Sequence, residues 1–170
     1  MDNKFDDKYM NVILLGIPNS GKKTLLMGIR SKLQEWLPSD ENNSYYIVWM
    51  KFNFNGTNFN NSSTVRFVVT TSITSLPDKY KENIHGIIHL IDLTQCIRDQ
   101  EDSLEKERSN KRIVVARIGN KLDRIKMTKE LINNRKIKYI SLKEDKADPL
   151  MNNIIYKFRK RIDLEDLLSR

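Results

Sequence analysis

A glycine-containing segment near the start of the chain has the residue types and spacing of a phosphate-binding loop. Gly16, Gly21 and Lys22 fit the pattern G-x-x-x-x-G-K-[ST] up to its last position. The glycines let backbone N–H groups point inward around phosphate oxygens, and the lysine ammonium reaches the β- and γ-phosphates. The last position normally carries a hydroxyl that holds Mg²⁺, and this chain has Lys23 there. The segment therefore predicts a nucleotide pocket beside an altered metal site.

The residues around this loop favour a pocket over an ordinary turn. The apolar run at 10–15 predicts a buried strand that leads into the loop, and a helix is expected from 22 to about 36. This order of strand, loop and helix is required, because the positive N-terminal end of the helix faces the phosphates. An ordinary strand–turn–helix connection remains the alternative.

A second polar segment, Asn120-Lys121-Leu122-Asp123, follows another buried apolar run. The Asp123 carboxylate can accept hydrogen bonds from the N1–H and the exocyclic amine of guanine, and adenine lacks this pair of donors. The Lys121 stem can lie across the base, and Asn120 can tie the loops together. Four polar residues after a strand also make a plain turn, which is the competing interpretation.

A third segment, Ser141-Leu142-Lys143, ends the last predicted strand and offers backbone N–H groups to guanine O6, although it carries little information alone. The three segments together give the predicted nucleotide-binding residues, which are Gly16, Asn19, Ser20, Gly21, Lys22, Lys23, Thr24, Asn120, Lys121, Asp123, Ser141, Leu142 and Lys143.

The elements that must position these residues alternate between strand and helix patterns, which predicts an α/β fold with a mostly parallel sheet covered on both faces. An antiparallel hairpin is expected from strands at 45–54 and 64–71, with an exposed Asn/Ser-rich tip at 55–63. Segment 72–83 reads as irregular or weakly helical. Further strands are expected at 86–92, 113–119 and 137–141, and helices at 99–110, at 128–135 and from 148 or 149 onward.

Composition places the chain among soluble globular proteins of one domain: it has 170 residues, 39% hydrophobic and 31% charged. No apolar run is long enough to span a membrane, and neither a signal peptide nor a lipidation site is expected. The single cysteine, Cys96, suits a reducing compartment. The net charge of +8 favours anionic partners such as nucleotides, acidic proteins or acidic lipid surfaces.

Taken together, the three segments resemble those of the small GTPase family, the G domains of the Ras and Arf-like type. Residues 16–26 are most similar to the Arf-like phosphate loop, and 86–93 are similar to the central strand of the family. Residues 120–123 match the guanine motif fully, and 141–143 are similar to its S-A-K element.

The resemblance covers nearly the whole chain. It implies a single three-layer P-loop G domain over 1–170, with a six-stranded, mostly parallel sheet and flanking helices, that binds GDP or GTP with Mg²⁺. Residues 1–9 are expected to form a flexible N-terminal segment.

The departures from the family lie around the metal and the second switch region. That region normally begins with D-x-x-G, usually followed by Gln. Here Thr70 stands in place of the metal-associated Asp, Ile73 in place of the Gly whose N–H meets the γ-phosphate, and Thr74 in place of the water-orienting Gln. Lys23 replaces the magnesium hydroxyl, and no threonine of the first switch region can be assigned.

Mg²⁺ prefers hard oxygen ligands, so we expect its role here to be weakened or absent. Lys23 would place a positive charge near the metal position, worth about 4 kcal/mol per unit of partner charge at ~4 Å and an effective dielectric of ~20. The hypothesis is that its ammonium partly replaces the cation, and the alternative is that it points to solvent. GTP hydrolysis is expected to be slow or absent, and no catalytic residue or metal ligand is assigned.

Two functions stay open: a guanine nucleotide-binding switch or adaptor, and a pseudo-GTPase that serves as a nucleotide-independent protein-interaction module. Effector or regulator proteins are expected partners of unknown identity, and nucleic acid is not expected. The basic cluster Lys157, Arg159, Lys160 and Arg161 is either the solvated face of a helix or a contact for an anionic membrane or an acidic protein. The expected location is the cytoplasm, with attachment to a membrane through a partner as a further option.

Overall fold

The computed structural model describes residues 9–29, 34–37, 44–54, 62–108, 112–126, 137–142 and 147–169. Its strands are β1 (Met10–Leu15), β2 (Gln34–Leu37), β3 (Tyr45–Asn53), β4 (Ser62–Thr70), β5 (Gly86–Asp92), β6 (Val115–Asn120) and β7 (Ile137–Tyr139). The helices in these ranges are α1 (Lys22–Met27), α2 (Asp78–Lys81), α3 (Ile97–Glu107) and α5 (Ala147–Leu168), with a 3-10 turn, η1, at Leu122–Arg124.

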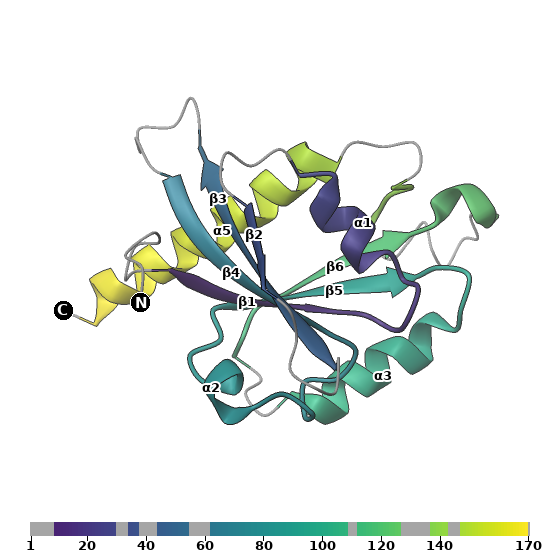
Figure 1. Ribbon diagram of the computed structural model, residues 1–170, viewed down its shortest axis with the longest axis horizontal. Coiled ribbons are helices and arrows are strands. Elements are labelled where there is room, and N and C mark those ends of the chain that lie inside the picture. Colours follow the sequence, from purple (N-terminus) through teal and green to yellow (C-terminus); the bar gives the residue numbers. More distant parts are fainter. Residues whose placement is uncertain are drawn as a thin grey trace.

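The strands form one sheet in the order β2-β3-β4-β1-β5-β6-β7 (Figure 1). β1 lies in the middle and is parallel to both β4 and β5, and β6 and β7 continue the parallel part. Only β2 with β3 and β3 with β4 pair antiparallel within the described sheet. The carboxyl ends of β1, β5 and β6 therefore meet at one edge, where ligands bind in open α/β sheets.

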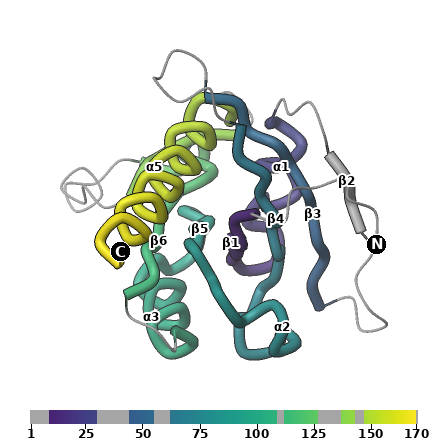
Figure 2. The backbone as a smooth tube through the Cα atoms, turned by 90° about the vertical axis from the view of Figure 1, so that its left-hand side faces the viewer, coloured from purple at the N-terminus to yellow at the C-terminus, as the bar shows by residue number. Residues whose placement is uncertain are grey.

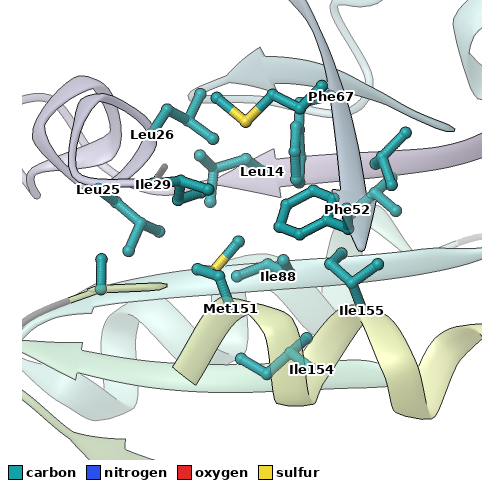
Figure 3. Close-up of a cluster of buried hydrophobic side chains, with 14 of the residues drawn as sticks. Leu14, Leu25, Leu26, Ile29, Phe52, Phe67, Ile88, Met151, Ile154 and Ile155 are labelled. Carbon is teal, nitrogen blue, oxygen red and sulfur yellow. The ribbon is translucent and has the colours of Figure 1, made fainter. Parts of the chain in front are cut away.

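Helices cover both faces of the sheet, because successive side chains of a strand point to opposite faces. Val12 and Leu14 of β1 belong to the core beneath α1 and α5, whereas Ile13 and Leu15 belong to the core on the side of α2 and α3. Figure 2 shows α5 and α1 on one side of the strands and α3 and α2 on the other. Figure 3 shows the first core, where Leu25, Leu26, Met151 and Ile155 close over Leu14 and Ile88.

This architecture confirms the predicted three-layer α/β class, the central parallel strands and the antiparallel hairpin. Two expectations were wrong. The helix predicted from 22 to about 36 ends at Met27, and 34–37 form strand β2, so the sheet has seven strands rather than six. Gly28 ends α1, since glycine disfavours helix, and the antiparallel pairing of β2 with residues 47–50 of β3 outweighs local helix preference.

The other boundaries differ from the predictions by a few residues. The expected helix at 128–135 and most of the hairpin tip lie outside the described residues, and only Tyr9 of segment 1–9 lies within them. Tyr9 packs edge-on against Trp49, with ring centroids 4.9 Å apart. No helix in the described ranges has the length and apolar character needed to cross a membrane.

His89 is a buried polar residue in the middle of the sheet. It is 2% exposed, stands opposite Arg117 in the register of β5 and β6, and its Nδ1 has no hydrogen-bond partner among the described residues. Burial, and then the positive charge of Arg117, lower the pKa of the imidazole from 6.5 to about 4. The folded protein therefore holds His89 neutral at every pH above this value.

We predict that the free energy of unfolding falls as the pH is lowered from 6.5 to 4. In this window the unfolded chain binds a proton at His89 that the folded chain does not bind, and a shift from 6.5 to about 4 corresponds to about 3 kcal/mol. Below the folded pKa the contribution is constant. Urea unfolding measures the effect, and the His89→Leu variant should lose less stability over the same range. Parallel pH profiles for the two proteins would contradict the prediction.

Candidate nucleotide-binding site

The glycine loop between β1 and α1 is shaped by two close approaches of the backbone. A Cβ on Gly16 would lie 2.5 Å from Ser20 Oγ and 2.8 Å from the Leu90 carbonyl oxygen. Gly21 has φ of +105°, and a Cβ there would lie 2.5 Å from Asn120 Nδ2. The pattern therefore requires glycine at both positions for reasons visible in the fold. Asn19 also has positive φ, 65°, a region that Asn tolerates better than most residues.

The loop presents its polar groups toward its own centre. The first intrahelical bond of α1 runs from the Leu25 N–H to the Gly21 carbonyl, so the N–H groups of 22–24 precede it and have no acceptor within the helix. The hydroxyl of Ser20 is buried and has no hydrogen-bond partner among the described residues. The first turn of α1 contains no acidic residue. This arrangement suits an anion.

Lys22 lies across the loop that it follows. Its Nζ donates to the carbonyl oxygens of Gly16, at 2.6 Å, and Ile17, at 3.0 Å. Burial lowers the pKa of this ammonium from 10.5 to about 8. The charge is thus held over the loop by two neutral acceptors, and a phosphate placed there would stabilise it.

The side chain of Asn120, the last residue of β6, connects the glycine loop to the loop that follows β7. Its Nδ2 donates to the carbonyl oxygen of Ser20 at 2.9 Å, and its Oδ1 accepts from the N–H of Leu142 at 3.0 Å. The residue is 5% exposed. Two hydrogen bonds of the Asn120 side chain therefore connect the Ser20 carbonyl to the Leu142 N–H, and that N–H is already engaged within the protein.

Lys121 is held in a fixed position after β6. Its φ is 68°, an uncommon value for lysine, and its Nζ donates to Asp92 Oδ2 at 2.7 Å. Burial raises the pKa of Asp92, but hydrogen bonds from Lys121 and Thr94 outweigh burial and hold this pKa below its usual value. Asp92 is therefore ionised and holds the Lys121 ammonium at the carboxyl end of β5.

Asp123 lies in η1, beside the loop that follows β7. Its Oδ1 accepts a hydrogen bond from the Ser141 hydroxyl at 2.8 Å, and Ser141 is 2% exposed. Asp123 itself is exposed at this edge of the domain. The structure thus brings Asp123, Asn120 and the 141–142 loop together. Lys143 lies outside the described residues.

The side of the loop where a magnesium ion would bind has a different donor set. Lys23 and Thr24 are both exposed. Thr70 is buried, and its hydroxyl bonds to the carbonyl oxygens of Ser44, at 3.2 Å, and Ser72, at 2.9 Å. Among the described residues there is no cluster of three or more histidine, cysteine or acidic side chains that would suit a metal ion. Lys23 and Thr70 therefore do not supply the hydroxyl and the carboxylate that hold Mg²⁺ next to a phosphate loop.

The segment after β4 is bound to helix α3 through one carboxylate. Glu107 accepts hydrogen bonds from the Ser72 hydroxyl, from the Ile73 N–H at 3.3 Å and from the Thr74 hydroxyl at 3.4 Å. The Ile73 side chain is buried, 5% exposed, in the core on the α3 side. The Ile73 N–H, at the place expected to meet a γ-phosphate, is therefore already engaged within the protein.

Two residues of this arrangement were missed in the sequence. Asp92 ends a long apolar run, which is a signal for a residue at the ligand edge, but its pairing with Lys121 depends on the register of β5 and β6. Glu107 is one of many charged residues on a surface helix, and nothing in its surroundings singles it out.

Two solved structures with a similar fold contain G domains or GTP-binding proteins. The G domain of the FeoB iron transporter of T. maritima aligns with 89% of this chain and 99% of its own length, at 15% identity and a TM-score of 0.61. The ADP-ribosylation factor-like GTP-binding protein, or small COPII coat GTPase SAR1, of Encephalitozoon cuniculi in complex with GDP aligns with 94% of this chain and 84% of its own length, at 18% identity and a TM-score of 0.64. No protein-family model and no curated protein sequence matches this chain. The fold is therefore that of a P-loop G domain.

We predict that binding of a nucleoside diphosphate to the loop weakens above pH 8. Lys22 must be charged to bind phosphate, and its pKa of about 8 in the free protein means that it loses the proton above this pH. The bound state has a higher pKa, so the affinity should fall by about tenfold per pH unit. Titration calorimetry from pH 6.5 to 9 measures this, and a Lys22→Met variant should bind weakly with a flat profile. An unchanged affinity of the unsubstituted protein across this range would refute the assignment of Lys22.

Proposed function

We propose that this chain, which has the fold of a G domain, is a guanine nucleotide-binding protein with impaired hydrolysis that acts as a switch or adaptor. The observation that carries the proposal is the Asn120 side chain, which joins the glycine loop to the 141–142 loop by two hydrogen bonds. A rigid connection between a phosphate loop and a base loop serves a ligand that spans both. An ordinary strand–turn–helix connection has no need of it.

The residues beside this connection favour guanine. Asp123 is oriented by the Ser141 hydroxyl and is exposed at the ligand edge, and its carboxylate would accept from the N1–H and the exocyclic amine of the base. Lys121 is held by Asp92, so its aliphatic stem has a fixed direction along which a base can lie. The Lys22 ammonium and the N–H groups of 22–24 would bind the phosphates.

The Mg²⁺ requirement is proposed to be weakened. Lys23 and Thr70 replace the two groups that normally secure the ion, and the Thr70 hydroxyl is committed to main-chain carbonyls. Lys23 is exposed beside the loop, where its ammonium would offset part of the phosphate charge. Hydrolysis is proposed to be slow or absent, because no residue at 70–74 supplies a metal-associated carboxylate or a side chain that orients water.

A second candidate function is a pseudo-GTPase that works as a nucleotide-independent interaction module, with an effector or regulator protein as its partner. The contact of Glu107 with 72–74 supports it, since this segment is held by the protein itself. Heating the purified protein distinguishes the two functions: release of guanine nucleotide supports the nucleotide-binding protein, and its absence supports the interaction module. For either function we propose a cytoplasmic location.

We predict that Asp123→Asn changes the base preference from guanine toward xanthine. The amide replaces a double acceptor by one acceptor and one donor group, which matches the xanthine edge and conflicts with the guanine amine. Calorimetry with GDP and with xanthosine diphosphate should show that GDP affinity falls by about 100-fold or more while binding of the xanthine nucleotide improves. Asp102→Asn, on the exposed surface of α3, is the matched control and should change neither affinity. Unchanged preference in Asp123→Asn would sink the guanine assignment.

We also predict that removal of divalent cations with EDTA changes the affinity for GDP by less than about tenfold, because Lys23 and Thr70 stand where a hydroxyl and a carboxylate would hold Mg²⁺. In Lys23→Ser, which restores the hydroxyl of the pattern, dependence on Mg²⁺ should increase. Displacement of a fluorescent GDP analogue with and without EDTA measures both effects. A large loss of affinity of the unsubstituted protein in EDTA would show that the ion is held after all.

A further inference from the structure

The last turns of α5 carry an apolar surface that the described part of the fold does not cover. Leu164, Leu167 and Leu168 are 55%, 65% and 76% exposed. Figure 1 shows this end of the helix extending past the end of the sheet, away from the loops of the nucleotide site. The earlier half of the same helix is anchored, since Phe158 is 3% exposed and packs where a Cβ on Gly86 would lie. The exposed leucines therefore belong to a well-supported helix.

Three cations share the face of these leucines. One row along the helix contains Lys157, Arg161, Leu164 and Leu168, at spacings of four, three and four residues, which place side chains on one helix face. Lys160 and Leu167 lie next to this row. Lys157 and Lys160 are exposed.

The acidic residues of this part of α5 lie beside or behind that row. Asp163 pairs with Arg159 at 3.3 Å, and Glu165 pairs with Arg161 at 3.3 Å. Glu165 also lines a pocket together with His85, Arg112 and Arg161. The outward face therefore carries Lys157 and Lys160 next to the leucines, whereas Arg161 and Glu165 partly neutralise each other, as do Arg159 and Asp163.

A groove adjoins this face between α5 and the edge of β6. Its volume is about 360 Å³, and apolar residues of both elements line it, among them Leu150 of α5 and Val115 of β6. The groove is also lined by four cationic residues, Arg117, Lys138, Lys157 and Arg161, and its described lining contains no acidic side chain. Arg117 lies 3.8 Å from Glu105 and Arg161 lies 3.3 Å from Glu165, so the cationic character of the groove rests mainly on Lys138 and Lys157. The combination of apolar and cationic lining residues suits an anionic amphiphile.

We propose that the outward face of α5 and its groove bind an anionic membrane surface, with the leucines in the boundary between headgroups and acyl chains and the cations at lipid phosphates. Charge decides between this partner and a second copy of the chain: the net charge is +8, and two copies of this face would bring cations against cations. Leucines beside lysine and arginine on one helix face are the pattern of helices that lie in a membrane interface. This surface is separate from the nucleotide site and does not depend on the proposed function.

Flotation of the full chain with vesicles tests this proposal. Vesicles of phosphatidylcholine with about one third phosphatidylserine should bind about 100-fold more strongly than phosphatidylcholine alone, as three cations near an anionic surface give about fivefold each. Lys157→Glu with Lys160→Glu should reduce binding by about 25-fold or more. Leu167→Ser with Leu168→Ser should reduce it by about tenfold or more and should remove the part that resists high salt.

The matched control is Lys106→Glu with Lys126→Glu, which changes the net charge equally at exposed positions outside α5 and should change binding by less than about threefold. Thermal unfolding and GDP affinity of each variant show that the fold and the nucleotide site are intact. Equal binding to both vesicle types, or an equal loss in the control, overturns the proposal. Binding to polyglutamate without binding to vesicles also overturns it and indicates that the partner is an acidic protein. A dimer that the leucine substitutions abolish overturns it as well and indicates that the partner is a second copy of the chain.

Discussion

The nucleotide edge of this domain depends on the side chain of Asn120. One carboxamide satisfies the Ser20 carbonyl and the Leu142 N–H, groups that come from loops far apart in the chain. Because the residue is buried, removing it would leave both groups without a partner, at a cost of about 1–3 kcal/mol each. The same contact explains Gly21, since any side chain there would displace the amide. The phosphate loop and the base loop are thus one structural unit.

The two halves of the site have opposite characters. On the base side, Lys121 and Asp123 are oriented by protein partners and still present surfaces to a ligand. Around 70–74 the polar groups are satisfied by the protein: Thr70 bonds to main-chain carbonyls, and Glu107 accepts from the Ile73 N–H. A γ-phosphate would have to displace a carboxylate to reach that N–H. This segment therefore has little to gain from a third phosphate, which supports the proposal that the protein does not switch strongly.

The sequence predicted those parts of the fold that depend on local patterns. The apolar runs of β1, β5 and β6 end in Gly16, Asp92 and Asn120, and the ends of these parallel strands define the ligand edge. β2 was missed because its four residues have no strand pattern and become a strand only by pairing with β3. The Glu107 contact was missed because it requires the end of β4 to lie beside the end of α3, which is a property of the assembled layers. Local signals therefore predict most of the elements, whereas long-range contacts decide β2 and the altered half of the site.

Helix α5 relates the nucleotide edge to the exposed leucines. Its first residue, Ala147, lies near Gly28 at the end of α1, and its 22 residues extend roughly 33 Å to the far side of the domain. A membrane at the distal face would therefore leave the nucleotide edge turned toward solvent. Such attachment fixes the orientation of the domain without any movement at 72–74, so it requires no coupling between the two sites. Because the first half of α5 is buried in the domain and its last turns are exposed, the helix alone can orient the domain on a membrane. The site at the other end of the domain then remains accessible to protein partners.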